Sequence, residues 1–204
     1  MQTDVHIIIF AKAPLAGFAK TRLIPVLGEA ETAKLARRLF FHAIEQALKA
    51  ELGTVELCVT PALDHACWQY LNLPASLLLT EQGQGDLGQR MAQACRRALQ
   101  QNKAVLLMGT DCPSLSADAL KQAAHSLMQY DACITPVSDG GYALLGLKAY
   151  DPSLFNEIPW STAAVAPMTL ERCRQLGWQV ETLPVLHDID EADDLQYLPQ
   201  EIKN

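Results

Sequence analysis

The residues Ala104-Val-Leu-Leu-Met-Gly-Thr-Asp-Cys-Pro113 join a short apolar run to a glycine, a single carboxylate and a proline. The run has the length of a buried strand, and Pro113 ends it because proline lacks the N–H that a strand ladder needs. Ser116 follows at the place of a helix N-cap. We therefore expect Asp111 at the carboxyl end of a parallel strand, where open α/β sheets bind ligands. Its alternative role is to cap a turn, where Asp is common.

Apolar runs of strand length alternate with helix-period segments along most of the chain. This alternation predicts one α/β domain over residues 1–204, a three-layer sandwich with a mostly parallel, doubly wound sheet. The predicted strands are residues 6–10, 55–60, 77–80, 104–109, 132–136, 142–147 and 178–183. The predicted helices are residues 29–50, 65–71, 86–100, 117–129, 162–176 and 191–198.

The composition limits the classes of partner. The chain has 204 residues and a formal net charge of -7, and this acidic balance argues against non-specific nucleic-acid binding, which needs clustered Lys and Arg. The apolar runs are strand-sized, too short to span a membrane, and no export signal is visible. Six cysteines occur without a Cys-x-x-Cys pair, which fits buried thiols in a reducing compartment. We expect a cytoplasmic protein that binds small molecules; the oligomeric state is left open.

A predicted loop over residues 11–28 carries Lys12, Lys20 and Arg22 and contains no acid. In an acidic chain, this local excess of positive charge suits a pyrophosphate. Lys binds a phosphate as a point charge, and Arg binds it through two parallel hydrogen bonds. The alternative is a solvated basic loop. The position of the loop, directly after the first strand, favours phosphate binding.

Further acids follow near the end of the chain, in His187-Asp-Ile-Asp190. Asp111 together with either Asp188 or Asp190 would supply two carboxylates for one divalent cation, Mg²⁺ or Mn²⁺, that also contacts a diphosphate. An acid at a helix start also interacts favourably with the helix dipole, which explains Asp190 without any function.

A tight turn with Asp139, Gly140 and Gly141 follows the predicted strand at residues 132–136. The paired glycines let a ligand approach the main chain closely, and Asp-Gly is also an ordinary hairpin signal. Because Asp139 should face the same crevice as Asp111, we consider it the candidate general base.

The aromatic and hydroxyl residues Trp160, Ser161 and Thr162 stand at the start of the predicted helix over residues 162–176. The hydroxyls either cap this helix, or the helix start and its aromatic neighbour bind an acceptor or a phosphate. The sequence leaves both readings open.

The residues Gly83-Gln-Gly-Asp-Leu-Gly88 match the Gly-x-Gly-x-x-Gly dinucleotide fingerprint. Two residues separate the preceding strand from the first glycine, however, and this is not the first strand-to-helix turn of the chain. An oxidoreductase that uses a nicotinamide or flavin is therefore an alternative rather than the main hypothesis.

A series of short motifs occurs in a fixed order along nearly the whole chain. They are Phe10-Ala-Lys-Ala-Pro14, Lys20-Thr-Arg-Leu23, Gln82 with Gly85-Asp-Leu-Gly-Gln-Arg-Met91, Gly109-Thr-Asp-Cys-Pro113, Asp139-Gly-Gly-Tyr142, Trp160-Ser-Thr162 and Asp188-Ile-Asp190. This ordered set resembles the cofC-like family of glycosyltransferases, which is associated with radical-SAM/selenodomain gene neighbourhoods and was earlier grouped as a domain of unknown function.

The resemblance implies the GT-A-like fold of nucleotide-diphospho-sugar transferases and a likeness to the guanylyltransferases of coenzyme F420 and molybdenum-cofactor synthesis. It implies that Lys20 and Arg22 contact the diphosphate. By the same resemblance, Gln82, Gly85 and Gly88 lie near the base or ribose, Asp111 holds the metal, and Asp190 is a second metal or phosphate-side ligand.

We therefore hypothesise a metal-dependent glycosyltransferase that uses a nucleotide-diphospho-sugar donor and a small-molecule acceptor, with Mg or Mn as cofactor. Lys20 and Arg22 would stabilise the departing diphosphate. The close alternative is a nucleotidyltransferase that releases pyrophosphate. A non-catalytic nucleotide-binding protein is a third possibility, from a different functional class.

Overall fold

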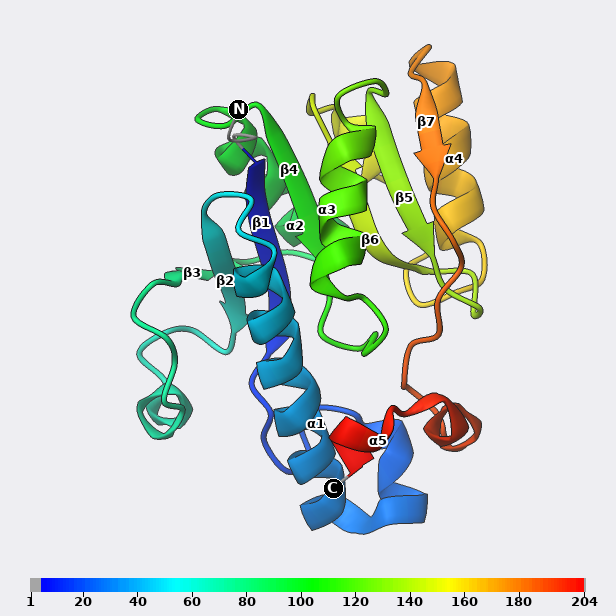
Figure 1. The fold of residues 1–204 in the computed structure, drawn as a ribbon. Coiled ribbons are helices and arrows are strands. Elements are labelled where there is room, and N and C mark those ends of the chain that lie inside the picture. The colour runs from blue at the N-terminus through cyan, green and yellow to red at the C-terminus, as the bar shows by residue number, and fades with distance from the viewer. Residues whose placement is uncertain (1–4, 204) are drawn as a thin grey trace.

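The computed structural model describes residues 5–203, which form a seven-stranded sheet with helices on both faces (Figure 1). The sheet order is β3-β2-β1-β4-β6-β5-β7. Only the pairs that involve β6 are antiparallel, to β4 and to β5. The strands are β1 (Val5–Lys12), β2 (Val55–Thr60), β3 (Leu78–Glu81), β4 (Ala104–Met108), β5 (Ala132–Pro136), β6 (Tyr142–Leu147) and β7 (Val180–Thr182). This confirms the expected α/β fold with a mostly parallel sheet.

Two helices cover each face of the sheet: α1 and α3 lie on one side, and α2 and α4 on the other (Figure 1). The α-helices are α1 (Ile24–Lys49), α2 (Leu87–Leu99), α3 (Ala117–Ser126), α4 (Val165–Gln175) and α5 (Gln200–Lys203). The 3-10 helices are η1 (Thr21–Leu23), η2 (Ala66–Tyr70), η3 (Pro152–Leu154) and η4 (Ala192–Tyr197). Within residues 5–203, no helix is both long and apolar enough to cross a membrane.

The isoleucines of β1 show how the strand period builds two cores. Ile7 and Ile9 pack into the cluster beneath α1 and α3, whereas Ile8 packs into the cluster beneath α2 and α4. Successive side chains of a strand point to opposite faces, so a continuous apolar run is what a strand covered on both faces requires. All three side chains are fully buried.

The start of α1 differs from the prediction. The sequence predicts a loop up to Gly28, but Thr21–Leu23 forms a 3-10 turn and α1 begins at Ile24. Pro25 stands in the first turn of α1, where proline is favoured because the N–H it lacks would have no intrahelical partner. Gly28, with φ 77° and ψ 161°, is a kink inside α1 rather than the end of a loop.

The start of α4 also differs. The predicted cap, Thr162, lies before the helix, and the N-cap residue is Ala164. The Thr162 hydroxyl donates to the Pro159 carbonyl at 2.7 Å and accepts from the Ala164 N–H at 3.3 Å, so it closes a local turn. The two predicted helices over residues 65–71 and 191–198 are both 3-10 helices.

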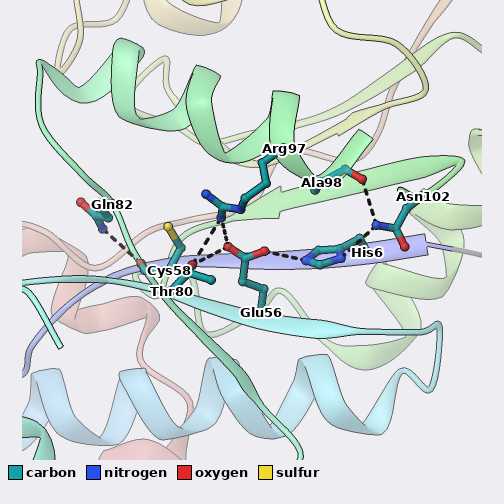
Figure 2. Close-up of polar contacts among 8 residues, drawn as sticks. All are labelled: His6, Glu56, Cys58, Thr80, Gln82, Arg97, Ala98 and Asn102. Atoms are coloured by element: carbon teal, nitrogen blue, oxygen red, sulfur yellow. Dashed lines mark hydrogen bonds and ion pairs between the residues drawn. The ribbon is translucent and has the colours of Figure 1, made fainter. Parts of the chain in front are cut away.

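A buried polar network fixes the edge of the sheet to α2 (Figure 2). Glu56 on β2 is 1% exposed, and its Oε2 lies 2.7 Å from Nε2 of His6 on β1. Its Oε1 accepts from the Thr80 hydroxyl at 2.5 Å and from the guanidinium of Arg97 on α2. Asn102 Nδ2 lies 3.2 Å from His6 Nδ1. Each polar group thus has a partner, which burial demands.

The pKa of Glu56 reflects two opposed effects. Burial raises the pKa of this carboxyl, but hydrogen bonds from His6 and Thr80 and the charge of Arg97 outweigh it, so the pKa lies below its ordinary value of 4.5. A carboxylate whose pKa is lower in the folded chain stabilises the fold above its unfolded pKa. That contribution is lost as the pH falls through the folded-state value.

We expect Glu56→Gln to lower the free energy of unfolding by about 2 kcal/mol at pH 7. This is less than the ~3–5 kcal/mol of a broken, fully buried pair, because Arg97 is partly exposed and can rehydrate. Glu45→Gln, which removes an exposed pair with Lys49 on α1, is the control and should change nothing measurable. Urea denaturation measures both. The difference in free energy of unfolding between wild type and Glu56→Gln should become smaller below pH 4.5. A difference that stays constant down to pH 3 would contradict this account.

Candidate active site

A cavity of about 430 Å³ opens at the carboxyl ends of the central parallel strands. Phe10 and Lys12 line it from the end of β1, Thr110 and Asp111 from the segment after β4, and Gln82 from the segment after β3. The sheet order places β2 and β4 on opposite sides of β1, so the chain changes direction there. Ligands of open α/β sheets bind in the crevice at such a point.

Oppositely charged side chains from distant parts of the chain meet in this cavity. Lys20 Nζ lies 2.5 Å from Asp111 Oδ1 and 4.0 Å from Asp190 Oδ1. Arg22 Nη1 lies 2.7 Å from Asp190 Oδ2 and 3.6 Å from a carboxylate oxygen of Glu191. The side chain of Lys20 is only 4% exposed, whereas that of Asp111 is 53% exposed. The ammonium group is therefore fixed, while one carboxylate remains open to solvent.

Main-chain contacts and apolar burial hold these loops together. The Ile189 N–H donates to the Asp111 carbonyl at 2.9 Å, which places Asp188 and Asp190 on either side of that contact. The Ile189 side chain is fully buried in a small apolar cluster with Leu23. The acidic segment and the basic loop therefore share one apolar anchor beneath the charged groups.

The turn after β5 brings a third carboxylate to the cavity. Asp139 lines it and accepts from the Gly141 N–H at 2.7 Å. Gly140 has φ 90°, and a Cβ there would lie 2.4 Å from backbone atoms of Ala163. Glycine is therefore required for the turn to pack against the segment that precedes α4.

Asp188 lines the same cavity, and its surroundings raise its pKa to about 6. Burial is the largest cause, and the charge of Asp139 adds to it. Two carboxylates that share a site disfavour each other's ionisation. The cavity thus contains basic side chains as well as acidic ones, and two of the basic ones, Lys20 and Arg22, are paired with carboxylates.

Gln82 lies at the cavity, but its amide is bound internally. Its Nε2 donates to the carbonyls of Ala11 at 3.1 Å and Cys58 at 3.2 Å, and its Oε1 accepts from Arg90 Nη1 at 2.8 Å. Arg90 on α2 is therefore a further cation of the cavity that the sequence interpretation did not single out. The sequence does contain a signal for Arg90, because this residue lies eight positions after Gln82 in the same motif.

Two of the expected nucleotide-binding glycines do not line this cavity. Gly85 has φ 109° and lies in the loop before α2. Gly88 is buried in α2, and a Cβ there would meet the Phe155 carbonyl oxygen at 2.4 Å and the indole nitrogen of Trp160 at 2.6 Å. Gly88 thus permits close packing of α2 against Trp160.

A second cavity, of about 240 Å³, adjoins the first. Trp160, Thr162 and Gly141 line it, and Ser161 lines both cavities. The Trp160 ring lies edge-on to Tyr142, with ring centroids 6.5 Å apart. The structure therefore places the Trp160-Ser-Thr162 motif beside the site, but as loop residues rather than as a helix start.

Asp111 and Asp190 have the oxygen ligands that a divalent cation prefers, but the Lys20 ammonium lies between them. Within the described part of the chain, no three or more His, Cys, Asp and Glu side chains form a group that could hold a metal. An ion here would need oxygen ligands from a phosphate and from water, as Mg²⁺ typically does.

The fold is that of nucleotide-diphospho-sugar transferase-like proteins. Residues 43–162 match DUF2064, a family described as an uncharacterized protein conserved in bacteria, and this chain belongs to that family. A search of curated proteins finds no significant match to the sequence.

Solved structures extend the comparison. A protein of Desulfovibrio desulfuricans G20, which carries the provisional name nucleotide-diphospho-sugar transferase, is 31% identical with a TM-score of 0.90 over 99% of this chain and 89% of its own. The inositol-1-phosphate CTP transferase of T. maritima is 14% identical with a TM-score of 0.61, covering 99% and 94%. Rv0371c of Mycobacterium tuberculosis H37Rv, in complex with manganese, is 17% identical with a TM-score of 0.57, covering 97% and 98%. The last two share the fold.

We expect Gln82→Leu to lower the free energy of unfolding by about 2 kcal/mol, because it removes two buried hydrogen bonds to the carbonyls of Ala11 and Cys58 and the acceptor of Arg90. Gln84→Leu, at an exposed position in the same loop, should change little and serves as the control. Chemical denaturation measures both. Unchanged stability of Gln82→Leu, combined with lost nucleotide binding, would instead assign Gln82 to direct ligand contact.

Proposed function

We propose that this protein is a metal-dependent glycosyltransferase that uses a nucleotide-diphospho-sugar donor. The observation that carries the proposal is the meeting of Lys20 and Arg22 with Asp111 and Asp190 in one cavity at the switch point of the sheet. The 31% identical Desulfovibrio protein of the same fold supports this class of reaction.

The basic residues of the cavity are suited to a diphosphate. Lys12, Lys20, Arg22 and Arg90 all line it, although the chain as a whole is acidic. Arg22 is 57% exposed, so its guanidinium can turn from Asp190 towards a phosphate and bind two oxygens at once. Lys20 is held in place and acts as a fixed positive charge. Such preorganised charge stabilises the negative charge that develops on a departing diphosphate.

The carboxylates of Asp111 and Asp190 would hold Mg²⁺ or Mn²⁺ together with the diphosphate oxygens. The bound ion would supply Lewis-acid neutralisation of the leaving group. The complex of Rv0371c with manganese, a protein of the same fold, supports this choice of ion. Lys20 lies within ion-pair distance of both carboxylates, so its ammonium would lie beside an ion that they hold.

The proposed transfer forms one bond, breaks one bond and moves one proton. The acceptor hydroxyl oxygen forms a bond to the anomeric carbon of the sugar, and the bond from that carbon to the diphosphate oxygen breaks. The hydroxyl proton passes to Asp139, which we assign as the general base because it lines both cavities. The nucleoside diphosphate leaves with the electron pair of the broken bond, beside Lys20 and Arg22.

One observation favours a second candidate, a nucleotidyltransferase. The CTP transferase of T. maritima shares the fold over nearly the whole chain. The four cations of the cavity would also suit a triphosphate. The two reactions differ in their leaving group, which is a nucleoside diphosphate in glycosyl transfer and pyrophosphate in nucleotidyl transfer.

We expect wild-type protein to bind GDP or UDP more tightly with MnCl₂ than with EDTA, as measured by isothermal titration calorimetry. Asp111→Asn should weaken binding at least about tenfold in manganese, which corresponds to about 1.4 kcal/mol. In EDTA, Asp111→Asn should not weaken nucleotide binding, because the loss of the carboxylate charge frees the Lys20 ammonium to contact a phosphate. Asp118→Asn on α3, whose side chain is 96% exposed, is the matched control. Failure of wild type to bind either nucleotide, or equal binding by Asp111→Asn, would contradict the proposal.

The leaving group tests the reaction class directly. With panels of UDP- and GDP-sugars, we expect slow, manganese-dependent release of the nucleoside diphosphate even without the acceptor, and a strong reduction by Arg22→Ala. With CTP, UTP or GTP and sugar 1-phosphates, we expect no pyrophosphate. Pyrophosphate release without diphosphate release would replace the glycosyltransferase proposal by the nucleotidyltransferase one.

A further inference from the structure

The second cavity differs in chemistry from the first although the two adjoin. They share Phe10, Leu87, Ser161 and two carboxylates, those of Asp139 and Asp188. A molecule in one cavity therefore lies next to a molecule in the other, with the carboxylates at the boundary. This is the arrangement that a donor and an acceptor need.

The walls of the second cavity are mostly apolar. The rings of Phe10, Tyr142 and Trp160 line it, and Met91 and Val165 contribute aliphatic surface from α2 and α4. Its volume is about 240 Å³. An apolar cavity of about 150 Å³ is enough to bind benzene, so a group with one aromatic ring fits here.

The charged residues of the second cavity are all acidic. Asp139 and Asp188 line it, and no Lys, Arg or His side chain is among its lining residues in the described part of the chain. The first cavity, in contrast, is lined by four cations. A phosphate or carboxylate on the acceptor would meet two negative charges in a partly desolvated site and find no counter-charge.

Few hydroxyl groups of a ligand could be satisfied in this cavity. Apart from the two carboxylates, the lining residues with hydrogen-bonding side chains are Ser161, Thr162, Tyr142 and Trp160. The Tyr142 hydroxyl is buried, and the Trp160 indole nitrogen lies against Gly88 of α2. The Thr162 hydroxyl already donates to the Pro159 carbonyl. A sugar ring with several hydroxyls would leave buried polar groups unpaired, which is costly. One hydroxyl directed at Asp139 is compatible with the site.

We propose that the second cavity is the acceptor site, and that it takes an uncharged alcohol on an apolar or aromatic body and rejects phosphorylated acceptors. This rests on the proposed function, because Asp139 must receive the proton of that hydroxyl. The proposal names the chemical class of the acceptor. It also distinguishes this site from the sites of nucleotidyltransferases, which join a nucleotide to a phosphate group.

The test uses 2-phenylethanol and 2-phenylethyl phosphate, which differ only in the charged group. Ligand-observed NMR measures binding of the alcohol, and the phosphate is assayed as its competitor, so that phosphate binding in the first cavity is not counted. We expect the phosphate to bind at least tenfold more weakly than the alcohol. Asp139→Asn, which keeps an oxygen to accept from the Gly141 N–H, should narrow this difference at least threefold.

Trp160→Ala should weaken binding of the alcohol about tenfold. Trp178→Ala removes another half-buried indole, one that does not line the cavity; it should not weaken binding, and it controls for loss of packing. Circular dichroism and thermal unfolding show that both variants are folded. Equal or tighter competition by the phosphate, or alcohol binding that is indifferent to Trp160→Ala, would overturn the proposal.

The nucleotide titration is carried out separately on the same protein samples. Wild type that binds neither GDP nor UDP, but still prefers the alcohol to its phosphate, would overturn the proposed function and support the ligand class of the second cavity. Wild type that binds a nucleotide but prefers the phosphate would overturn only the acceptor assignment.

Discussion

The contact between the Lys20 ammonium and the Asp111 carboxylate is the interaction on which the site depends. It joins the loop after β1 to the loop after β4, the two strands that flank the switch point of the sheet. Lys20 is almost fully buried, and a buried ammonium needs a partner of opposite charge. Asp190 lies 4.0 Å from the same ammonium and so links the segment before η4 to the two loops. Three distant segments thus form one charged surface.

The strands follow from the sequence because their signal is local. A run such as Val105 to Met108 excludes water on both faces, and few structures other than a central strand use it. The orientation of β6 is also local, because the Gly140 turn is short and returns the chain beside β5. The starts of α1 and α4 were predicted less well, since Gly28 and Thr162 have signals that fit both a cap and an interior kink or turn.

The site was predictable only in part, because it is assembled by long-range contacts. The basic loop and Asp111 could each be placed at a strand end from local pattern. Periodicity does not indicate their contact with Asp190, 168 residues from Arg22 along the chain: the residue types left Asp188 and Asp190 open, and the family resemblance implied Asp190. Arg90 was missed because helix patterns identify the buried face and say nothing of which polar residue faces a cavity. The internal hydrogen bonds of Gln82 were missed for another reason: this residue lies in the loop after β3, and its partners Ala11 and Cys58 belong to other strands.

The last turn of the chain lies beside the first loop rather than apart from it (Figure 1). Ile202 of α5 is buried with Leu23 and Ile189, and the carbonyls of Ile202 and Lys203 accept from Arg38 on α1. The apolar support of the charged loops is therefore completed by a residue of α5. No residue of α5 is among those that line the two cavities, so a substitution in this helical turn can disturb the charged loops without touching a ligand.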